Sequence, residues 1–253
     1  MLRVGHQHGD AMRGEPVDEE GVLHRDRGAD QADGRVAGLL ARLGDDITEV
    51  QERLGGLSSP KVVLSTVDFA ELTDLEEHER WDQIGELLAE AGRGVERAGA
   101  DFLLLCTTTF HKVADAVSDA VDIPLLHLGD VVAEACKQDG HTTVGLIGTT
   151  VAMEDSFFVD RLAAHGVTVL VPDAKHHDTL NSAIYDELVH GNVVDATRRR
   201  VVAITEELWD AGAGAILLGC TELELLIRQA DIELPAIPCT TLHVQAAIDK
   251  ALA

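Results

Sequence analysis

The sequence has few aromatic residues and few cations. Aromatic residues make up 3% of its 253 positions, so the core must be built mainly from Leu, Val, Ile and Ala. Lys and Arg number 20 against 45 Asp and Glu, which gives a formal net charge of −25. Because such a charge repels phosphate-rich surfaces, we expect neither nucleic acid nor a membrane as a partner.

The chain also lacks long apolar runs and paired-cysteine motifs. No apolar stretch approaches the ~18 residues of a membrane span, and no signal peptide is recognisable. The four cysteines include no C-x-x-C pair, so we expect a cytoplasmic protein with reduced thiols. Its 12 histidines show no complete ligand spacing, and no glycine-rich nucleotide motif is present. We therefore expect no metal and no cofactor.

What the chain does contain is one short phrase in two copies. The segments 98–107 (AGADFLLLCT) and 211–221 (AGAGAILLGCT) each end in Cys-Thr. The apolar runs inside them are short and unalternating, as in strands buried on both faces of a parallel sheet. A lone cysteine in such a run is more often a packing residue, but the repeated context favours a functional one. We expect Cys106 and Cys220 at the carboxyl ends of two strands, where α/β proteins bind ligands.

Strand-like and helical patterns alternate along the rest of the chain, which predicts parallel sheets with right-handed crossovers. Together with the repeat, this predicts an α/β fold of two pseudo-symmetric, doubly wound domains with the active site in the cleft between them. Strands are expected at 36–40, 61–67, 102–105, 125–128, 143–148, 167–171 and 215–218, and helices at 45–54, 81–98, 111–120, 131–137, 153–165, 179–190 and 195–209.

The domain boundaries follow from the repeat and from composition. Residues 1–34 are polar and lack either apolar period, so they read as a disordered or atypical N-terminal arm. The first domain is expected to comprise residues 35–123 with 236–253, because the C-terminal helix is expected to pack back on the half that contains Cys106. Residues 124–235 form the second domain, which contains Cys220.

Two cysteines that face each other predict proton transfer. A helix N-terminus can lower a thiol pKa enough to make a base at neutral pH. Hydroxyl groups follow both cysteines, and hydroxyls and backbone N–H groups can hold a substrate carboxylate. Bases on opposite faces of one α-carbon can remove a proton and return it on the other side, which is racemisation without a cofactor. The neighbouring polar residues are Thr107, Thr108 and Thr109 after Cys106, and Thr221 and Glu222 after Cys220.

A nucleophilic hydrolase is the alternative that needs only one cysteine. Such an enzyme usually requires a histidine positioned by a third group. His111 lies so soon after Cys106 that it suits a supporting role, or simply the start of a helix, better than a catalytic triad.

Four segments together resemble the aspartate/glutamate racemase family, particularly its cofactor-independent aspartate and broad-specificity amino-acid racemases: 61–69, 98–115, 144–162 and 216–226. The resemblance runs from about Val50 to the C-terminus. It implies that Cys106 and Cys220 are the two proton acceptors and donors, and that the threonines 107–109, Thr221 and Glu222 line the site. Thr149, in the turn after the strand 143–148, is a further candidate for substrate binding. A homodimer and a small amino-acid substrate are also implied.

The sequence departs from this family in several places. The glycine-rich loop that normally follows the first strand is absent from 39–44. The family usually has other residues at Thr108, Glu76, Ala152 and Cys239. Cys136 and Cys239 match no catalytic motif, so we expect them to be buried. Two alternatives therefore stay open: an impaired relative that binds a small amino acid or dicarboxylate, and a related isomerisation or decarboxylation. Only Lys112 lies close enough to a motif to pair with a distal carboxylate.

Overall fold

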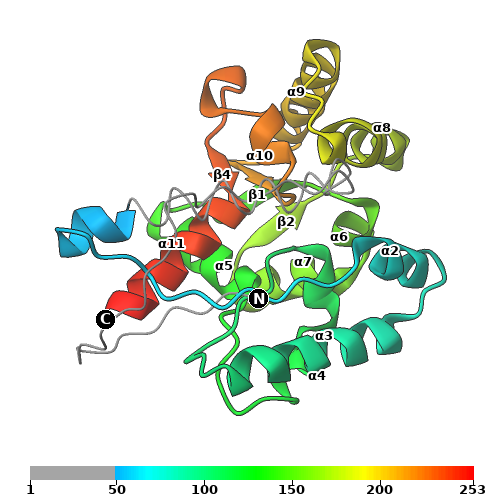
Figure 1. The fold of residues 1–253 in the computed structure, drawn as a ribbon. Coiled ribbons are helices and arrows are strands. Elements are labelled where there is room, and N and C mark those ends of the chain that lie inside the picture. Colours follow the sequence, from blue (N-terminus) through cyan, green and yellow to red (C-terminus); the bar gives the residue numbers. More distant parts are fainter. Residues whose placement is uncertain (1–48) are drawn as a thin grey trace, which may run out of the picture.

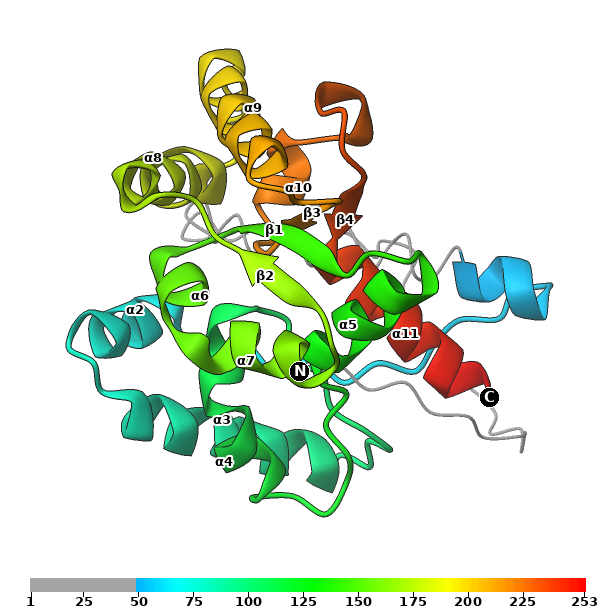
Figure 2. The same ribbon diagram turned by 180° about the vertical axis from the view of Figure 1, so that it is seen from behind.

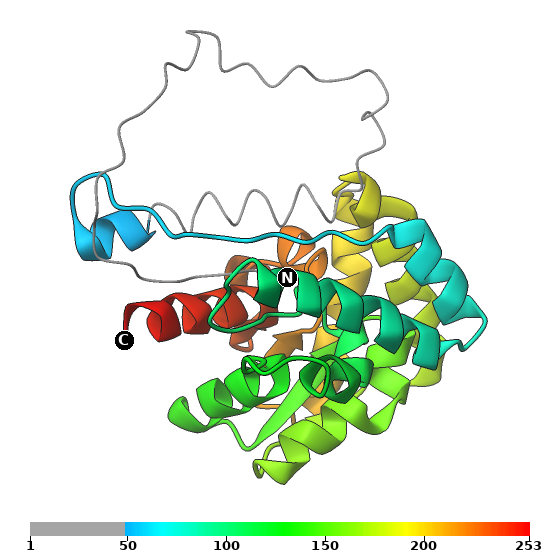
Figure 3. The ribbon, with the colours of Figure 1, turned by 60° about the horizontal axis from the view of Figure 1, so that its bottom comes forward.

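The computed structural model describes residues 49–253 (Figure 1). The expected arm 1–34, the strand 36–40 and the shortened loop 39–44 lie outside the described residues. Residues 49–54, the described part of the helix expected at 45–54, are helical. The chain then runs without regular structure through residues 55–68 to helix α2 (Phe69–Glu77), as the cyan part of the ribbon in Figure 3 shows.

The chain has the α/β fold that the alternating pattern predicts, built on a four-stranded parallel sheet. The strand order is β2-β1-β3-β4. Leu146 pairs with Leu217 at the centre of the sheet, and both side chains are fully buried. The apolar runs at 143–147 and 216–218 form the central strands because each has a packed layer on both faces. The strands are β1 (Thr143–Ile147), β2 (Thr168–Leu170), β3 (Ile216–Leu218) and β4 (Ala236–Pro238).

Helices cover both faces of this sheet. Helices α8 and α9 lie on one side, and α5 and α11 lie on the other (Figures 1 and 2). Their buried side chains, such as Leu180 from α8, Ile204 from α9 and Val132 from α5, join the strands in one hydrophobic core. The helices of this part are α5 (Leu128–Gln138), α6 (Thr150–Glu154), α7 (Ser156–Ala164), α8 (His177–Ser182), α9 (Asp195–Asp210), α10 (Leu223–Leu226) and α11 (Cys239–Leu252).

The part of the chain around Cys106 has less sheet than expected. Among the described residues, its only strand pairing is a single parallel bridge between Leu103 and Leu125. The prediction of a strand at 61–67 is wrong, since that segment has no strand partner among the described residues. Apolar packing holds the region instead: Phe102 and Leu104 contact Ala247 of α11, while the alternate residues Leu103 and Leu105 join a second cluster.

Two helices form the outer layer of this region. Helix α3 (Trp81–Arg97) matches the expected apolar period and buries Ile84, Leu88 and Val95. Helix α2 (Phe69–Glu77) was not expected; it begins after Asp68, whose side chain accepts a hydrogen bond from the Ala70 N–H. The helix expected at 111–120 is a 3₁₀ turn, η1 (Thr109–Val113), followed by the short helix α4 (Ala114–Ser118).

The C-terminal segment joins both parts of the molecule. Strand β4 is hydrogen-bonded to β3 and so completes the sheet that leads to Cys220. Helix α11 then packs against Phe102 and Leu104, and His243 on this helix hydrogen-bonds to the Leu126 carbonyl at 2.7 Å. The sequence assigned residues 236–253 to the first domain, whereas β4 is hydrogen-bonded to the sheet of the second. The division into two domains stays a prediction.

In residues 49–253, no helix has both the length and the apolarity that a membrane crossing requires.

Three histidines meet where η1, α5 and α11 join. The ring of His111 lies 4.7 Å from that of His127 and 5.8 Å from that of His243, measured between centroids. Burial lowers the pKa of His127 and of His243 from 6.5 to about 4. Burial, with the two neighbouring rings, holds the pKa of His111 well below its ordinary value. All three are therefore neutral in the folded protein at pH 7.

The free energy of unfolding is expected to fall as the pH drops from about 6.5 to about 4. In that window the unfolded chain binds protons that the buried histidines do not accept. For His243 the shift from 6.5 to about 4 corresponds to about 3 kcal/mol. Urea unfolding at pH 7, 5.5 and 4.5 measures this loss. The variant His243→Gln keeps a donor for the Leu126 carbonyl but no titrating ring, so its profile should be flatter; an unchanged profile would contradict this assignment.

Candidate active site

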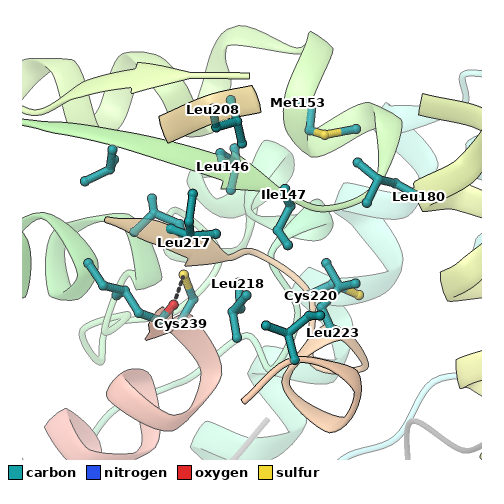
Figure 4. Packing of buried hydrophobic residues seen from close by; sticks show 14 of the residues in the cluster. Leu146, Ile147, Met153, Leu180, Leu208, Leu217, Leu218, Cys220, Leu223 and Cys239 are labelled. Atoms are coloured by element: carbon teal, nitrogen blue, oxygen red, sulfur yellow. Dashed lines mark hydrogen bonds between the residues drawn. The ribbon is translucent and has the colours of Figure 1, made fainter. Parts of the chain in front are cut away.

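The two cysteines of the repeated phrase lie at the ends of two buried segments. Cys220 follows β3 and Gly219, and its side chain lies beside Leu218 and Leu223 (Figure 4). The Gly219 N–H donates to the Ile147 carbonyl at 2.8 Å, which keeps the end of β3 beside the end of β1. Cys106 follows the segment 102–105, whose four side chains are all buried. Neither cysteine takes part in a disulfide bond.

One cavity of about 160 Å³ reaches both thiols. The two cysteines and the six neighbouring or turn residues that the sequence predicts to bind substrate all line it. These residues are Cys106, Thr107, Thr108, Thr109, Thr149, Cys220, Thr221 and Glu222. The structure thus brings the candidates of both phrases to one place, and their individual roles stay predictions.

Glu222 makes the surroundings of the two thiols unequal. Its Oε2 accepts hydrogen bonds from the Cys220 thiol at 2.8 Å and from the Thr221 hydroxyl at 2.9 Å. Glu222 is buried, with 2% of its surface exposed. Thr108 stands two residues after Cys106, where Glu222 stands after Cys220, so the first phrase has a neutral hydroxyl in place of this carboxylate.

A hydrogen bond between two threonines joins the loops at the site. The hydroxyls of Thr109 and Thr149 are 3.1 Å apart, and both residues are buried. Thr149 also caps α6, because its hydroxyl accepts from the Ala152 N–H at 3.3 Å. The candidate Thr149 is therefore held both by its own helix and by the loop that follows Cys106.

His111 lies behind the pocket and does not line it. Its Nδ1 is 2.7 Å from the Thr107 carbonyl, and its Nε2 is 3.1 Å from the Leu128 N–H. A carbonyl can only accept, so Nδ1 carries the proton, and Nε2 accepts from the first residue of α5. The neutral ring thus ties the loop after Cys106 to a buried helix, which fits the supporting role and gives no support to a hydrolase triad.

Replacing His111 is expected to loosen this loop. In His111→Phe the Thr107 carbonyl and the Leu128 N–H lose their partner, at about 1 to 3 kcal/mol for each buried group. Urea unfolding measures that loss, and the turnover number for α-hydrogen exchange should fall with it. His111→Asn retains a donor near the Nδ1 position and should recover part of the turnover. Equal turnover in the two variants would show that the ring only fills space.

Lys112 points away from the pocket. Its ammonium pairs with Asp155 at 2.5 Å and lies 4.0 Å from the centre of the Trp81 ring. Lys112 lines a separate groove between α3 and α4. The cation that the sequence offered for a distal carboxylate is therefore engaged elsewhere.

Only one of the four family departures named in the sequence lies in this pocket. Thr108 lines it, whereas Glu76 lines a neighbouring hollow beside α2, and Ala152 is buried in the first turns of α6. Cys136 and Cys239 are fully buried, as expected. Burial raises the pKa of Cys136 to about 11 and holds the pKa of Cys239 well above its ordinary value, so neither thiol is a base at neutral pH.

The sequence did not indicate the apolar wall of the pocket. This wall comes from the irregular segment before α2 and from helices α2 and α3. Leu72 and Leu88 are apolar residues that a sequence could mark as buried. Their position beside the cysteines depends on how α2 and α3 pack, which the sequence does not show. The residues missed are Leu64, Ser65, Thr66, Val67, Phe69, Leu72, Leu88 and Ala91.

In residues 49–253, no three or more His, Cys, Asp or Glu side chains gather in an arrangement that could hold a metal ion. The cluster of His111, His127 and His243 is committed to backbone partners instead: the Thr107 carbonyl, the Gly129 N–H and the Leu126 carbonyl, respectively.

The chain resembles proteins that act on amino acids. A crystal structure of a candidate Asp/Glu racemase from Yersinia pestis superposes with a TM-score of 0.80 at 35% identity, over 87% of this chain and 96% of that chain. An aspartate racemase homologue from Pyrococcus horikoshii gives a TM-score of 0.73 at 27% identity over the same shares. A broad specificity amino-acid racemase from Bacillus subtilis is 21% identical over 68% of this chain and 74% of its own length. Residues 46–247 match the model of the Asp/Glu/hydantoin racemase family, and the chain therefore belongs to that family.

Proposed function

We propose that this protein racemises a free amino acid without pyridoxal phosphate, using Cys106 and Cys220 as opposing acid and base. The observation that carries the proposal is the shared pocket: thiols from the two copies of one phrase line a single cavity together with their threonines. The cavity is small, as suits a substrate that must be held close to both sulfurs.

The proposed reaction moves one proton off the α-carbon and one proton onto it. A thiolate on one side removes the α-hydrogen, and the electron pair is delocalised into the substrate carboxylate. The thiol on the other side then donates its proton to the opposite face. The enzyme ends with the protonation states of the two cysteines exchanged, so it is ready for the opposite enantiomer.

The polar residues of the pocket have distinct parts in this proposal. The hydroxyls of Thr107 and Thr108 hold the substrate carboxylate, where negative charge grows as the α-proton leaves. The Thr221 hydroxyl donates its one proton to Glu222 and so helps to orient that side chain beside Cys220. Glu222 accepts the Cys220 thiol proton in a hydrogen bond, which favours the protonated form of this cysteine. We therefore assign Cys220 as the proton donor of the resting enzyme and Cys106 as the base.

The test is α-hydrogen exchange in heavy water. Purified protein is incubated with single amino acids, and loss of the α-proton signal is followed by NMR together with the change in optical rotation. Exchange with inversion supports the proposal. Calorimetric binding of amino acids with no exchange of any of them would instead indicate a binding protein, the reading that the altered position Thr108 keeps open.

A further inference from the structure

The wall of the pocket away from the threonines is apolar. Six of the lining side chains there are hydrocarbon: Leu64, Val67, Phe69, Leu72, Leu88 and Ala91. Leu72 comes from α2, and Leu88 and Ala91 come from α3, two helices that pack against each other. Leu72 and Leu88 are buried. A substrate whose α-carbon lies between the thiols would meet this wall with its side chain.

Charge in the pocket has one sign. Of the described residues that line it, none is Lys or Arg, and the one acid is Glu222, hydrogen-bonded to Cys220. The nearest cation in sequence, Lys112, is paired with Asp155 and stacked on Trp81 in another groove. Among the described residues, a second carboxylate on the substrate would therefore find no counter-ion and would leave water next to hydrocarbon and a buried acid.

We propose that the substrate is an amino acid with an uncharged, apolar side chain, of leucine size, and not aspartate or glutamate. Burial of hydrocarbon against α2 and α3 supplies the affinity for the side chain, while the threonines take the carboxylate that every amino acid shares. The catalytic part of this inference rests on the proposed racemase function; the binding preference does not.

Leucine and aspartate are the matched pair for the test. In both side chains the Cβ methylene is bonded to a Cγ that carries two terminal heavy atoms. The two side chains are therefore similar in size and differ mainly in charge. We expect kcat/KM for α-hydrogen exchange to be at least ~100-fold higher with leucine than with aspartate, as a missing counter-ion and lost apolar contact together imply. Equal or higher kcat/KM with aspartate would overturn the inference while leaving the racemase function intact.

Calorimetry separates this inference from the function it rests on. If no amino acid is exchanged, the racemase proposal fails, and direct binding of leucine and aspartate decides the preference. Tighter binding of leucine supports the apolar subsite. Tighter or equal binding of aspartate, or no binding of leucine, overturns it.

A positive charge placed on the apolar wall tests whether the substrate side chain lies against it. Leu72→Arg puts a cation on α2 at the pocket, and it should move the leucine-to-aspartate ratio toward aspartate by at least ~10-fold. Leu75→Arg is the matched control, because Leu75 lies on the same helix and packs against the same apolar cluster as Leu72 without lining the pocket. The same ratio in both variants would contradict the placement of the side chain.

A second variant covers the case in which Leu72→Arg does not fold. Ala91→Leu narrows the pocket from α3 without adding charge. Exchange of leucine should fall at least ~10-fold relative to exchange of the small substrate alanine. An unchanged ratio between the two substrates would show that the substrate side chain lies elsewhere.

Discussion

Replacing either Cys106 or Cys220 with alanine is expected to lower racemisation by at least ~100-fold. Each substitution removes the group that must take or give a proton on one face, and such groups typically contribute 100- to 10,000-fold. In the proposed reaction the two thiols act on opposite faces of the α-carbon, so neither can substitute for the other. Polarimetry with the preferred amino acid measures the loss.

The two single variants should also differ from each other. Each retains one base, so each should still exchange the α-hydrogen of one enantiomer slowly with solvent without inverting it, and the enantiomer should be opposite in the two variants. Cys136→Ala is the control, because Cys136 is buried in the core away from the pocket and should leave racemisation unchanged. Full racemisation in the variant that lacks both pocket cysteines would exclude the two-base reaction.

Gly219→Ala is expected to lower activity by about 100-fold and stability by about 1 to 3 kcal/mol. A Cβ at this position would lie 2.6 Å from Leu146 Cδ1 and 3.1 Å from the Ile147 carbonyl oxygen. Leu146 is fully buried and the carbonyl belongs to a central strand, so neither moves freely, and overpacking of this kind carries that penalty. The strain displaces the next residue, Cys220, and a shift of about 1 Å can reduce catalysis 100-fold.

Gly148→Ala is the matched control for this prediction. Gly148 ends the neighbouring strand segment, but its Cβ would lie 3.5 Å from Ala152 Cβ and from the Gly219 carbonyl oxygen, which is ordinary contact. Thermal unfolding and α-hydrogen exchange on both variants separate the two effects. If Gly219→Ala were as stable and active as Gly148→Ala, the close approach of β3 to β1 would not control the position of Cys220.

The strands that the sequence predicted most accurately are those in which a short, unalternating apolar segment is buried on both faces. The runs at 143–148 and 215–218 became central strands because unalternating apolar residues have no solvent face to occupy. The run at 102–105 is buried as expected, yet it makes one bridge with Leu125 and no ladder. Apolar content predicts burial, whereas a ladder also needs an adjacent strand in register, and that is a property of the whole chain.

The candidate site divides in the same way. The two Cys-Thr phrases and the residues after them were enough to select seven residues that line one pocket, and Thr149 was added from the turn after the strand 143–148. The supporting contacts of His111 and the pairing of Lys112 with Asp155 depend on residues distant in the chain, so no local pattern indicated them. Nor did the sequence indicate that α2 would form and bring Leu72 to the pocket.

By itself, then, the sequence identified residues that line the pocket, because a thiol at the end of an apolar run, followed by hydroxyls, is a local feature of the sequence. Tertiary structure alone decided what those residues face. The approach of α2 and α3 supplies an apolar wall, and the burial of Glu222 beside Cys220 makes the two thiols unequal. Both are consequences of packing between distant segments, where the environment of a side chain, and not its identity, sets charge, space and proton affinity.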